Sequence, residues 1–271
     1  KTWQLSIIYV ALFILVFLSL IPHLGVLITS FAKSWCNTYL PGAYTYKAYT
    51  YLAYSSCLTG IKNSFFYASI ATVINLIIGS FIAYVIAKKK VCFVGVIDAI
   101  VMLPMFLPGL VLGFGYILTY MNTSLDPGKN PTTLLIMAYA IRYIPYTVRA
   151  CIAGLQQLNV SLEEASSVFG ASPLRTFWQI TMPAILPSIL GSGLLAFSRT
   201  ILEVSESLCL ATKQAYYPIS KVIYSLYCSH GDGPVKASAL GVVTLILISF
   251  IVIIANRLLN KKAGSLFNAS N

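Results

Sequence analysis

The chain has 271 residues, of which 58% are hydrophobic and 9% are charged. Its mean hydropathy is +0.82 and its formal net charge at pH 7 is +11. This composition excludes an ordinary soluble domain, because such a domain needs more polar and charged residues on its surface. We therefore expect the chain to be surrounded by membrane lipid, and we expect no nucleic acid as a partner.

Six apolar segments are long enough to cross a bilayer, which takes roughly 20 apolar residues over about 30 Å of hydrocarbon. They cover residues 5–28, 64–87, 96–120, 133–153, 185–211 and 237–254. Transmembrane barrels alternate apolar and polar residues, and these segments do not. The predicted fold class is therefore all-α, a single polytopic domain over residues 1–271 with six transmembrane helices. A more polar loop over about 156–183 separates the fourth helix from the fifth.

Basic residues near the segment ends predict the orientation of the chain. One group lies on the cytoplasmic side if both termini are cytoplasmic: Lys88, Lys89, Lys90, Arg149, Arg175, Arg257, Lys261 and Lys262. A second group then lies outside with only Asp126 and Asp232 to balance it: Lys33, Lys47, Lys62, Lys129, Lys213, Lys221 and Lys236. This basic outer face either steers an anionic solute or an acidic protein, or only keeps the loops soluble.

The first segment is too long for a signal peptide and has no small-residue cleavage site after it, so we expect a retained helix. Six cysteines lack the spacing of a metal site: Cys36, Cys57, Cys92, Cys151, Cys209 and Cys228. A disulfide among Cys36, Cys57 and Cys228 and free thiols are both open. No nucleophile has a recognisable base and no glycine-rich phosphate loop is present. We expect no enzyme activity, no metal and no cofactor in this chain.

The loop over 156–183 has the signals of two short helices joined by a turn. Ser161 is predicted to cap a helix over about 162–169, because a serine hydroxyl can accept a hydrogen bond from a free N–H at the start of a helix. Glu163 and Glu164 then lie in the first turn, where carboxylates favour the positive end of the helix dipole. Gly170 suits the left-handed residue that closes such a helix. Ser172 and Pro173 then begin a second helix, which is predicted to end at Thr181.

The same loop carries a recognisable motif. It reads Glu164-Ala165-Ser166, then Gly170 after three more residues, then Ile180-Thr181-Met182-Pro183 after nine more. This resembles the EAA loop of permease subunits of type I binding-protein-dependent ABC importers. Ser166 stands where a second alanine is usual, and Met182 stands where leucine is usual. The segments 103–109, 142–146 and 202–206 extend the resemblance to the ferric-iron, phosphonate and spermidine/putrescine permeases.

The resemblance implies a fold, a location and a set of partners. It implies the MetI-like six-helix fold in a bacterial cytoplasmic membrane, a second permease subunit or half, and an extracytoplasmic solute-binding protein. It also implies two ABC ATPase subunits that bind ATP and magnesium. The residues implied to contact the ATPase are Glu163, Glu164, Ala165, Gly170, Ala171, Pro173, Ile180 and Pro183. The implied solute is ferric iron or a phosphonate or phosphorylated compound, with a polyamine third. The chain is either a complete subunit or half of a fused permease.

Charged and proline residues inside the apolar segments mark a second candidate site. Charges at membrane depth usually face a bundle interior or a water-filled path. We expect Arg142 to pair with Glu203, and Arg199, Glu203 and Glu206 to share one helix face. Prolines at 104 and 108, with Gly109, are expected to interrupt the third helix.

These seven residues either line or gate a translocation path, or they brace the helices statically. A secondary transporter or channel that uses Glu203 and Glu206 is the alternative function. A membrane-embedded enzyme is a more distant alternative.

Overall fold

The computed structural model describes residues 2–35, 38–53, 55–88 and 93–268. Lys89, Lys90, Cys36 and Cys92 lie outside these residues, and the side chains of Lys261 and Lys262 are not described. The chain forms two compact units, Lys1–Leu58 with Val222–Leu247, and Thr59–Lys221 with Ile248–Asn271. The helices α3, α11 and α12 each contribute to both units.

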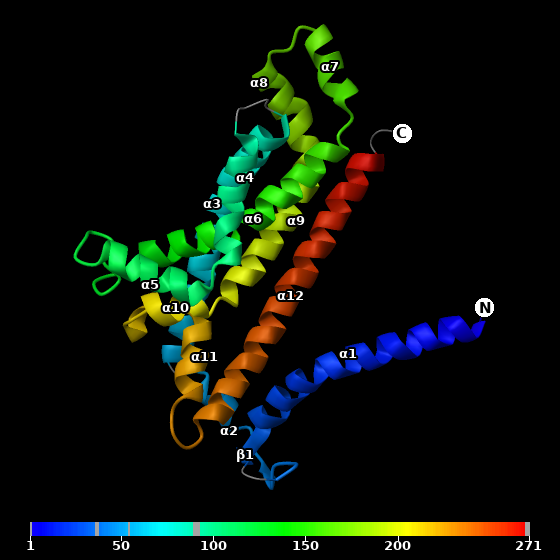
Figure 1. The fold of residues 1–271 in the computed structure, drawn as a ribbon. Coiled ribbons are helices and arrows are strands. Elements are labelled where there is room, and N and C mark those ends of the chain that lie inside the picture. Colours follow the sequence, from blue (N-terminus) through cyan, green and yellow to red (C-terminus); the bar gives the residue numbers. More distant parts are fainter. Residues whose placement is uncertain (1, 36–37, 54, 89–92, 269–271) are drawn as a thin grey trace. The chain divides into compact units, whose positions relative to one another are not determined.

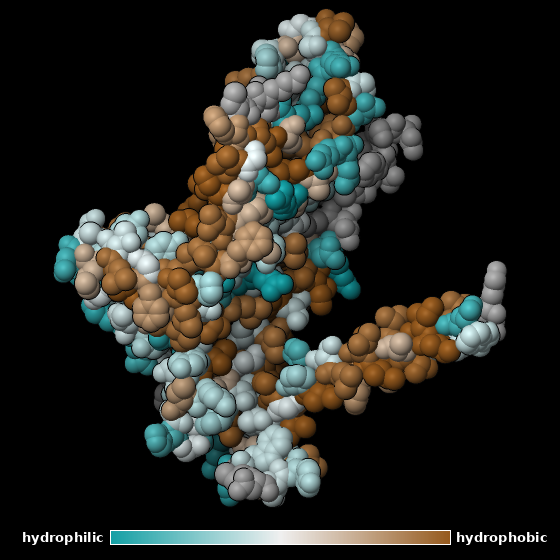
Figure 2. Space-filling model, viewed as in Figure 1, coloured by the Kyte–Doolittle hydropathy of each residue, from teal (hydrophilic) through white to brown (hydrophobic). Residues whose placement is uncertain are grey.

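The first unit contains a long apolar helix followed by a small hairpin-like sheet. Its elements are α1 (Thr2–Phe31), β1 (Ala32–Ser34), β2 (Ala43–Tyr44), α2 (Lys47–Tyr51) and the N-terminal part of α12 (Gly233–Asn268). The two strands are antiparallel, with Ala32 opposite Tyr44. Figure 2 shows α1 covered by hydrophobic side chains along most of its visible face. Such a helix is suited to lipid or to another apolar helix.

The second unit contains both candidate sites. Its elements are α3 (Ser55–Lys88), α4 (Val94–Phe106), α5 (Gly109–Tyr120), α6 (Thr132–Gln157), α7 (Val160–Val168), α8 (Pro173–Thr176), the π-helical turn η1 (Phe177–Thr181), α9 (Met182–Ile201), α10 (Ser205–Leu210), η2 (Gln214–Tyr216) and the start of α11 (Ile219–Tyr227). The central helix is α6, whose buried residues belong to both hydrophobic clusters of this unit. Figure 1 shows α7 and α8 beyond the ends of α4, α6 and α9, with α5 beside α10.

Four helices in the described part are long and apolar enough to cross a membrane, and the bent pair α4 and α5 makes a fifth if it is one span. The four cover Trp3–Phe31, Ser56–Lys88, Pro173–Ile201 and Gly233–Arg257. The segment predicted over 133–153 is helical as part of α6. The chain is thus mostly helical, as predicted. That it has six transmembrane helices stays a prediction.

The predicted interruption of the segment over 96–120 is confirmed. The segment is divided into α4 and α5, which are bent by 103°. Leu107 between them is extended, with φ −81° and ψ 137°, because the ring of Pro108 disfavours a helical residue before it. Pro104 lies inside α4 and does not break it. Only Pro108 therefore interrupts the segment, and Gly109 starts the next helix.

The helix predicted over 185–211 also needs correction. It begins at Met182, where it continues from η1, and α9 ends at Ile201. A second helix, α10, starts at Ser205. The break is stabilised by the carboxylate of Glu203, which accepts hydrogen bonds from the backbone N–H groups of Ser205 and Glu206 at 2.9 and 3.3 Å. Glu203 thereby satisfies two donors that the end of a helix leaves unpaired.

Candidate functional site

The predicted turn at Gly170 is confirmed and closes α7. Gly170 has φ +77°, a conformation that side chains with a Cβ rarely adopt. Its N–H donates to the carbonyl of Ser167 at 3.0 Å, and the N–H of Ala171 donates to the carbonyl of Ser166 at 3.1 Å. These two bonds make a Schellman motif, which ends a helix and reverses the chain sharply. The result is the short projection of α7 and α8 seen in Figure 1.

The predicted cap at Ser161 is wrong. The residue before α7 is Asn159, whose side-chain oxygen accepts a hydrogen bond from the N–H of Ser161 at 3.1 Å. Asparagine is as good a cap as serine, and its position lets the helix begin two residues earlier, at Val160. Glu163 then lies in the first turn.

The start of the second short helix is as predicted, but its end is not. Ser172 caps α8 by accepting from the N–H of Arg175, and Pro173 occupies the first turn. The chain then continues through η1 into α9 without a break at Met182 and Pro183. A π-helical turn shifts the hydrogen-bond register by one residue, so the helix passes Pro183 without needing the N–H that proline lacks.

Glu163 binds two residues that are distant in the sequence. Its Oε2 lies 2.9 Å from the Nζ of Lys88, the last residue of α3, and its Oε1 accepts from the hydroxyl of Thr181 at 2.8 Å. Burial alone would raise the pKa of Glu163, but the bonds from Lys88 and Thr181 outweigh it and the pKa is lowered. Lys88 and Thr181 were not among the predicted site residues, since neither lies near Glu163 in sequence.

Most of the other predicted coupling residues lie on α7, on α8 or in the turn between them, while Ile180 and Pro183 lie in η1 and α9 at the base of the projection. Exposed residues are Glu164, Ala165, Gly170, Pro173 and Pro183, and half-buried ones are Ala171 and Ile180. Large apolar side chains are exposed beside them, with Phe169 89% and Val168 84% accessible, followed by Leu174 and Trp178. An apolar surface of this kind at the tip of a projection is typical of a protein contact.

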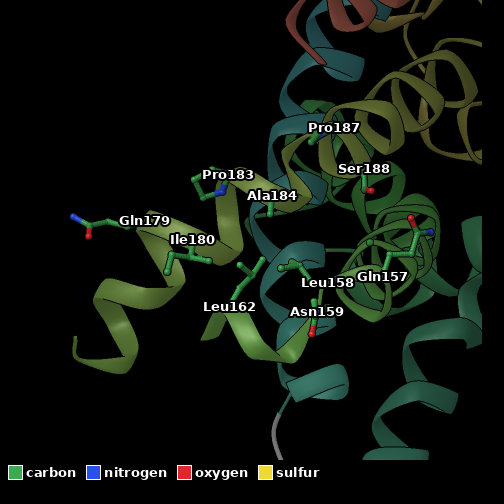
Figure 3. Close-up of a pocket in the computed structure, with 11 residues that line it drawn as sticks. Gln157, Leu158, Asn159, Leu162, Gln179, Ile180, Pro183, Ala184, Pro187 and Ser188 are labelled. Carbon is green, nitrogen blue, oxygen red and sulfur yellow. The ribbon is translucent and has the colours of Figure 1, made fainter. Parts of the chain in front are cut away.

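A groove of about 610 Å³ lies at the base of the projection. Figure 3 shows Leu162 of α7 pointing into it toward Ile180 of η1 and Ala184 of α9, while Leu158 lines the α6 side. The remaining lining residues are Gly154, Gln157, Asn159, Gln179, Pro183, Pro187 and Ser188. The groove separates α7 from α9, so packing does not join these two helices there.

Arg142 connects the two helix breaks. Its Nη1 donates to the carbonyl of Leu107, at the break between α4 and α5, at 3.3 Å. Its Nε lies 3.4 Å from Oε2 of Glu203, in the break after α9, and its Nη1 lies 3.7 Å from Oε1 of Glu206, in α10. The predicted pair of Arg142 and Glu203 is confirmed. The guanidinium of Arg142 on α6 thus contacts residues at both helix breaks.

Glu203 is the most fully bonded member of this ion cluster. Besides Arg142 and the two N–H groups of α10, its carboxylate accepts from the hydroxyl of Tyr143. The hydroxyls of Ser207 and Ser220 donate to its backbone carbonyl. Tyr143 was not predicted as a site residue, although its position next to Arg142 was a signal that could have indicated it.

Glu206 and Arg199 differ from their predicted placement. Glu206 is fully buried, and neither of its carboxylate oxygens accepts a hydrogen bond from the described residues. Arg199 is exposed and makes no ion pair within the described residues. The prediction that it shares a helix face with Glu203 and Glu206 is wrong, because the break at 202–204 ends the helical spacing.

One further polar residue is buried in the second unit. Asn75 of α3 has no exposed surface, and within the described residues neither atom of its amide has a hydrogen-bond partner. One turn further along α3, Gly79 contacts Thr147 of α6 so closely that a Cβ would lie 2.9 Å from the threonine side chain. Asn75 was not predicted, although an asparagine within an apolar segment is itself a signal.

No group of three or more histidine, cysteine, aspartate or glutamate residues that could hold a metal occurs in the described part of the chain. Cys57 and Cys228 are free thiols. The described residues form an exposed apolar surface on the projection at one place and an ion cluster that joins two broken helices at another.

Comparison with known sequences identifies relatives of this chain. A family model described as "Binding-protein-dependent transport system inner membrane component" matches residues 75–265. The molybdate/tungstate transport system permease protein WtpB of Pyrococcus abyssi is 30% identical over 161 residues, which are 59% of this chain and 62% of that protein. The ferric transport system permease protein FbpB of Actinobacillus pleuropneumoniae is 33% identical over 150 residues, 55% of this chain and 22% of that protein.

A third relative and a solved structure extend the comparison. The probable sulfate transport system permease protein cysT of Helicosporidium sp. is 30% identical over 214 residues, 74% of this chain and 76% of that protein. The crystal structure of a bacterial alginate ABC transporter in complex with an alginate pentasaccharide-bound periplasmic protein contains a similar chain, with a TM-score of 0.72 and 18% identity. The match covers 93% of both chains, and at this identity it shows a shared fold.

Proposed function

The chain belongs to the family of binding-protein-dependent transport system inner membrane components, the membrane permeases of ABC importers, and on this premise we propose how it works. It forms half of the solute path together with a second permease subunit or half. Two ATPase subunits bind ATP and magnesium and dock on the projection of α7 and α8. A solute-binding protein delivers the solute from outside, and both termini are cytoplasmic.

The observation that carries this proposal is the exposed apolar tip of the projection. Phe169, Val168 and Leu174 are costly to leave in water. They flank the turn that the positive φ of Gly170 makes possible. ATP binding draws the two ATPase subunits together, so a helix docked on each moves with it. Hydrolysis then resets the path. The ATPase chemistry resides on the partner subunit.

Replacement of Gly170 tests the docking. Gly170→Val places a β-branched residue at φ +77°, where it is strained, whereas Gly170→Asn is a matched control because asparagine tolerates this conformation. No atom lies within 4 Å of a Cβ at this position, so any difference between the two variants comes from backbone strain and not from a steric clash. We expect ATPase to co-purify with the wild type and Gly170→Asn, and to be lost from Gly170→Val. Absence of ATPase from a folded wild-type preparation would favour a secondary transporter that uses Glu203 and Glu206.

The ion cluster around Arg142 is proposed to latch the outer part of the path. It joins the α4–α5 break to the α9–α10 break, and such interrupted helices line solute sites in transporters. A static brace is the alternative, since well-packed apolar residues can replace a structural ion pair at little cost. The double variant Arg142→Met with Glu203→Gln separates the two, because the glutamine oxygen still accepts from the N–H groups of Ser205 and Glu206. Loss of uptake with unchanged folding supports the latch, and wild-type uptake supports the brace.

For the solute we propose a tetrahedral oxyanion of the molybdate and sulfate class. Two of the relatives are named for such anions, and the predicted basic outer face favours a negative solute. Ferric iron is the second candidate, because another relative is named for it. Uptake of radioactive molybdate, sulfate and iron(III) by membrane vesicles, each in competition with the other two, distinguishes these candidates. Uptake of iron(III) without competition by either oxyanion would overturn the oxyanion proposal.

A further inference from the structure

The helix α7 packs only weakly against the rest of the second unit. None of its residues is buried, and the groove of about 610 Å³ lies between Leu162 and α9. A helix that buries no side chain gains little from the hydrophobic effect and shifts easily relative to its neighbours. Something other than an apolar core must therefore transmit a force applied to α7.

Glu163 supplies polar contacts of the required kind. Its two carboxylate oxygens are bound separately, one by the Nζ of Lys88 at 2.9 Å and the other by the hydroxyl of Thr181 at 2.8 Å. The side chains of Lys88 and Glu163 are only 17% and 23% exposed, and Thr181 is buried. Partial burial weakens the screening that makes surface ion pairs ineffective.

The two partners of Glu163 lie at the ends of two long helices. Lys88 is the last residue of α3, which is apolar over Ser56–Lys88. Thr181 is the last residue of η1 and is followed directly by α9. Along these helices Leu76 of α3 contacts Gly193 of α9, where a Cβ would lie 2.9 Å from the leucine. The far end of α9 leads to the break that Glu203 caps.

We propose that Lys88, Glu163 and Thr181 form a polar tie that makes α7 move together with the inner ends of α3 and α9. Glu163 is then a positioning residue that passes the displacement of α7 to the membrane helices. The inference rests on the proposed function, in which an ATPase docks on the projection. It separates the roles of the two adjacent glutamates, since Glu164 is exposed on the docking surface and Glu163 faces the membrane domain.

Distance measurements on the assembled complex test the tie directly. Spin labels are attached at exposed positions 87 and 161 after replacement of the native cysteines, and the complex with its ATPase is compared without nucleotide and trapped with ATP and vanadate. We expect the same narrow distance distribution in both states for the wild type. In Glu163→Gln, which keeps size but loses the charge, we expect the trapped distribution to become at least about twofold broader.

Three comparisons make the result specific. The charge-swapped double variant Lys88→Glu with Glu163→Lys should restore the narrow distribution, because the ion pair forms in reverse. Asp98→Asn is the matched control, since it breaks the 3.0 Å pair of Asp98 with Arg149, which joins α4 to α6. In Glu163→Gln, ATP hydrolysis should continue while molybdate uptake per ATP falls about fivefold, as expected when a coupling free energy is lost.

The outcomes separate the tie from the proposed function. A narrow trapped distribution in Glu163→Gln, or a changed distance in the trapped wild type, overturns the tie and leaves the docking proposal intact. Loss of bound ATPase from Glu163→Gln alone also overturns it, because Glu163 would then belong to the docking surface. A folded wild type that retains no ATPase overturns the proposed function, and the tie with it.

Discussion

A Cβ atom on Gly109 would lie 2.7 Å from the Cβ of Ser205, so the first residue of α5 and the first residue of α10 are in closest contact at the two helix breaks. The same Cβ would lie 3.2 Å from the guanidinium carbon of Arg142. Gly109→Ala should therefore push the two breaks apart and destabilise the protein by about 1–3 kcal/mol, as overpacking usually does. Thermal unfolding of the purified protein in detergent measures this loss.

The control for this variant lies on the same helix. Gly115 has nothing within 4 Å of its Cβ position, so Gly115→Ala adds a better helix former without a clash. We expect its melting temperature to equal or exceed that of the wild type. Equal melting temperatures for both variants would mean that the contact between α5 and α10 is not rigid.

The two buried glutamates should respond differently to the same substitution. The carboxylate of Glu203 accepts from Tyr143 and two backbone N–H groups and pairs with Arg142. In Glu203→Gln the NH₂ group must therefore face one of these donors, with which it cannot form a hydrogen bond as an acceptor. Glu203→Gln should cost about 3 kcal/mol, as the loss of one partner of a buried ion pair does. Glu206 accepts no hydrogen bond from the described residues and lies farther from Arg142, at 3.7 Å. Glu206→Gln also avoids burying a charge without hydrogen bonds, so it should cost less than about 1 kcal/mol. Chemical denaturation compares them, and a larger loss for Glu206→Gln would contradict the geometry.

Ser166, which departs from the usual alanine of the EAA motif, makes a contact that alanine cannot make. Its hydroxyl lies 2.8 Å from that of Thr176, across the turn from α7 to α8. Ser166→Ala should cost the projection about 1 kcal/mol and speed the amide exchange of residues 160–176. Ser161→Ala is the control, since its hydroxyl makes no hydrogen bond within the described residues. Identical exchange in the two variants would show that the bond does not hold the turn.

Features that depend on a few neighbouring residues could be predicted from the sequence. The left-handed turn at Gly170 and the cap formed by Ser172 follow from local backbone chemistry, and both are confirmed. The pair of Arg142 and Glu203 could also be predicted, because two opposite charges at similar membrane depth must find each other.

Features that depend on distant partners could not be predicted. The contact of Glu163 with Lys88 spans 75 residues, and no local pattern indicates which residue Glu163 binds. The break after Ile201 was missed because residues 202–204 contain neither proline nor glycine, the usual signals of a helix break. The carboxylate of Glu203 stabilises the interruption instead. Arg199 was misplaced for the same reason, since an unbroken helix was assumed.

The stability contributed by Glu163 should depend on pH with a definite sign. Burial acts to raise its pKa, but the hydrogen bonds from Lys88 and Thr181 outweigh burial and lower the pKa below its ordinary value of 4.5. A group whose pKa is lowered by folding stabilises the folded state above the ordinary value, and that contribution is lost as the pH falls through the folded pKa. We therefore expect Glu163→Gln to speed the amide exchange of α7 by a constant factor over about pH 6 to 8. The difference should decline below 4.5 and vanish once the pH is below the folded pKa, where the wild type is protonated as well. The effect of Ser166→Ala serves as the reference, because no titratable group takes part in that bond. A difference between Glu163→Gln and the wild type that persists at the lowest pH would mean that the charge of Glu163 does not hold α7.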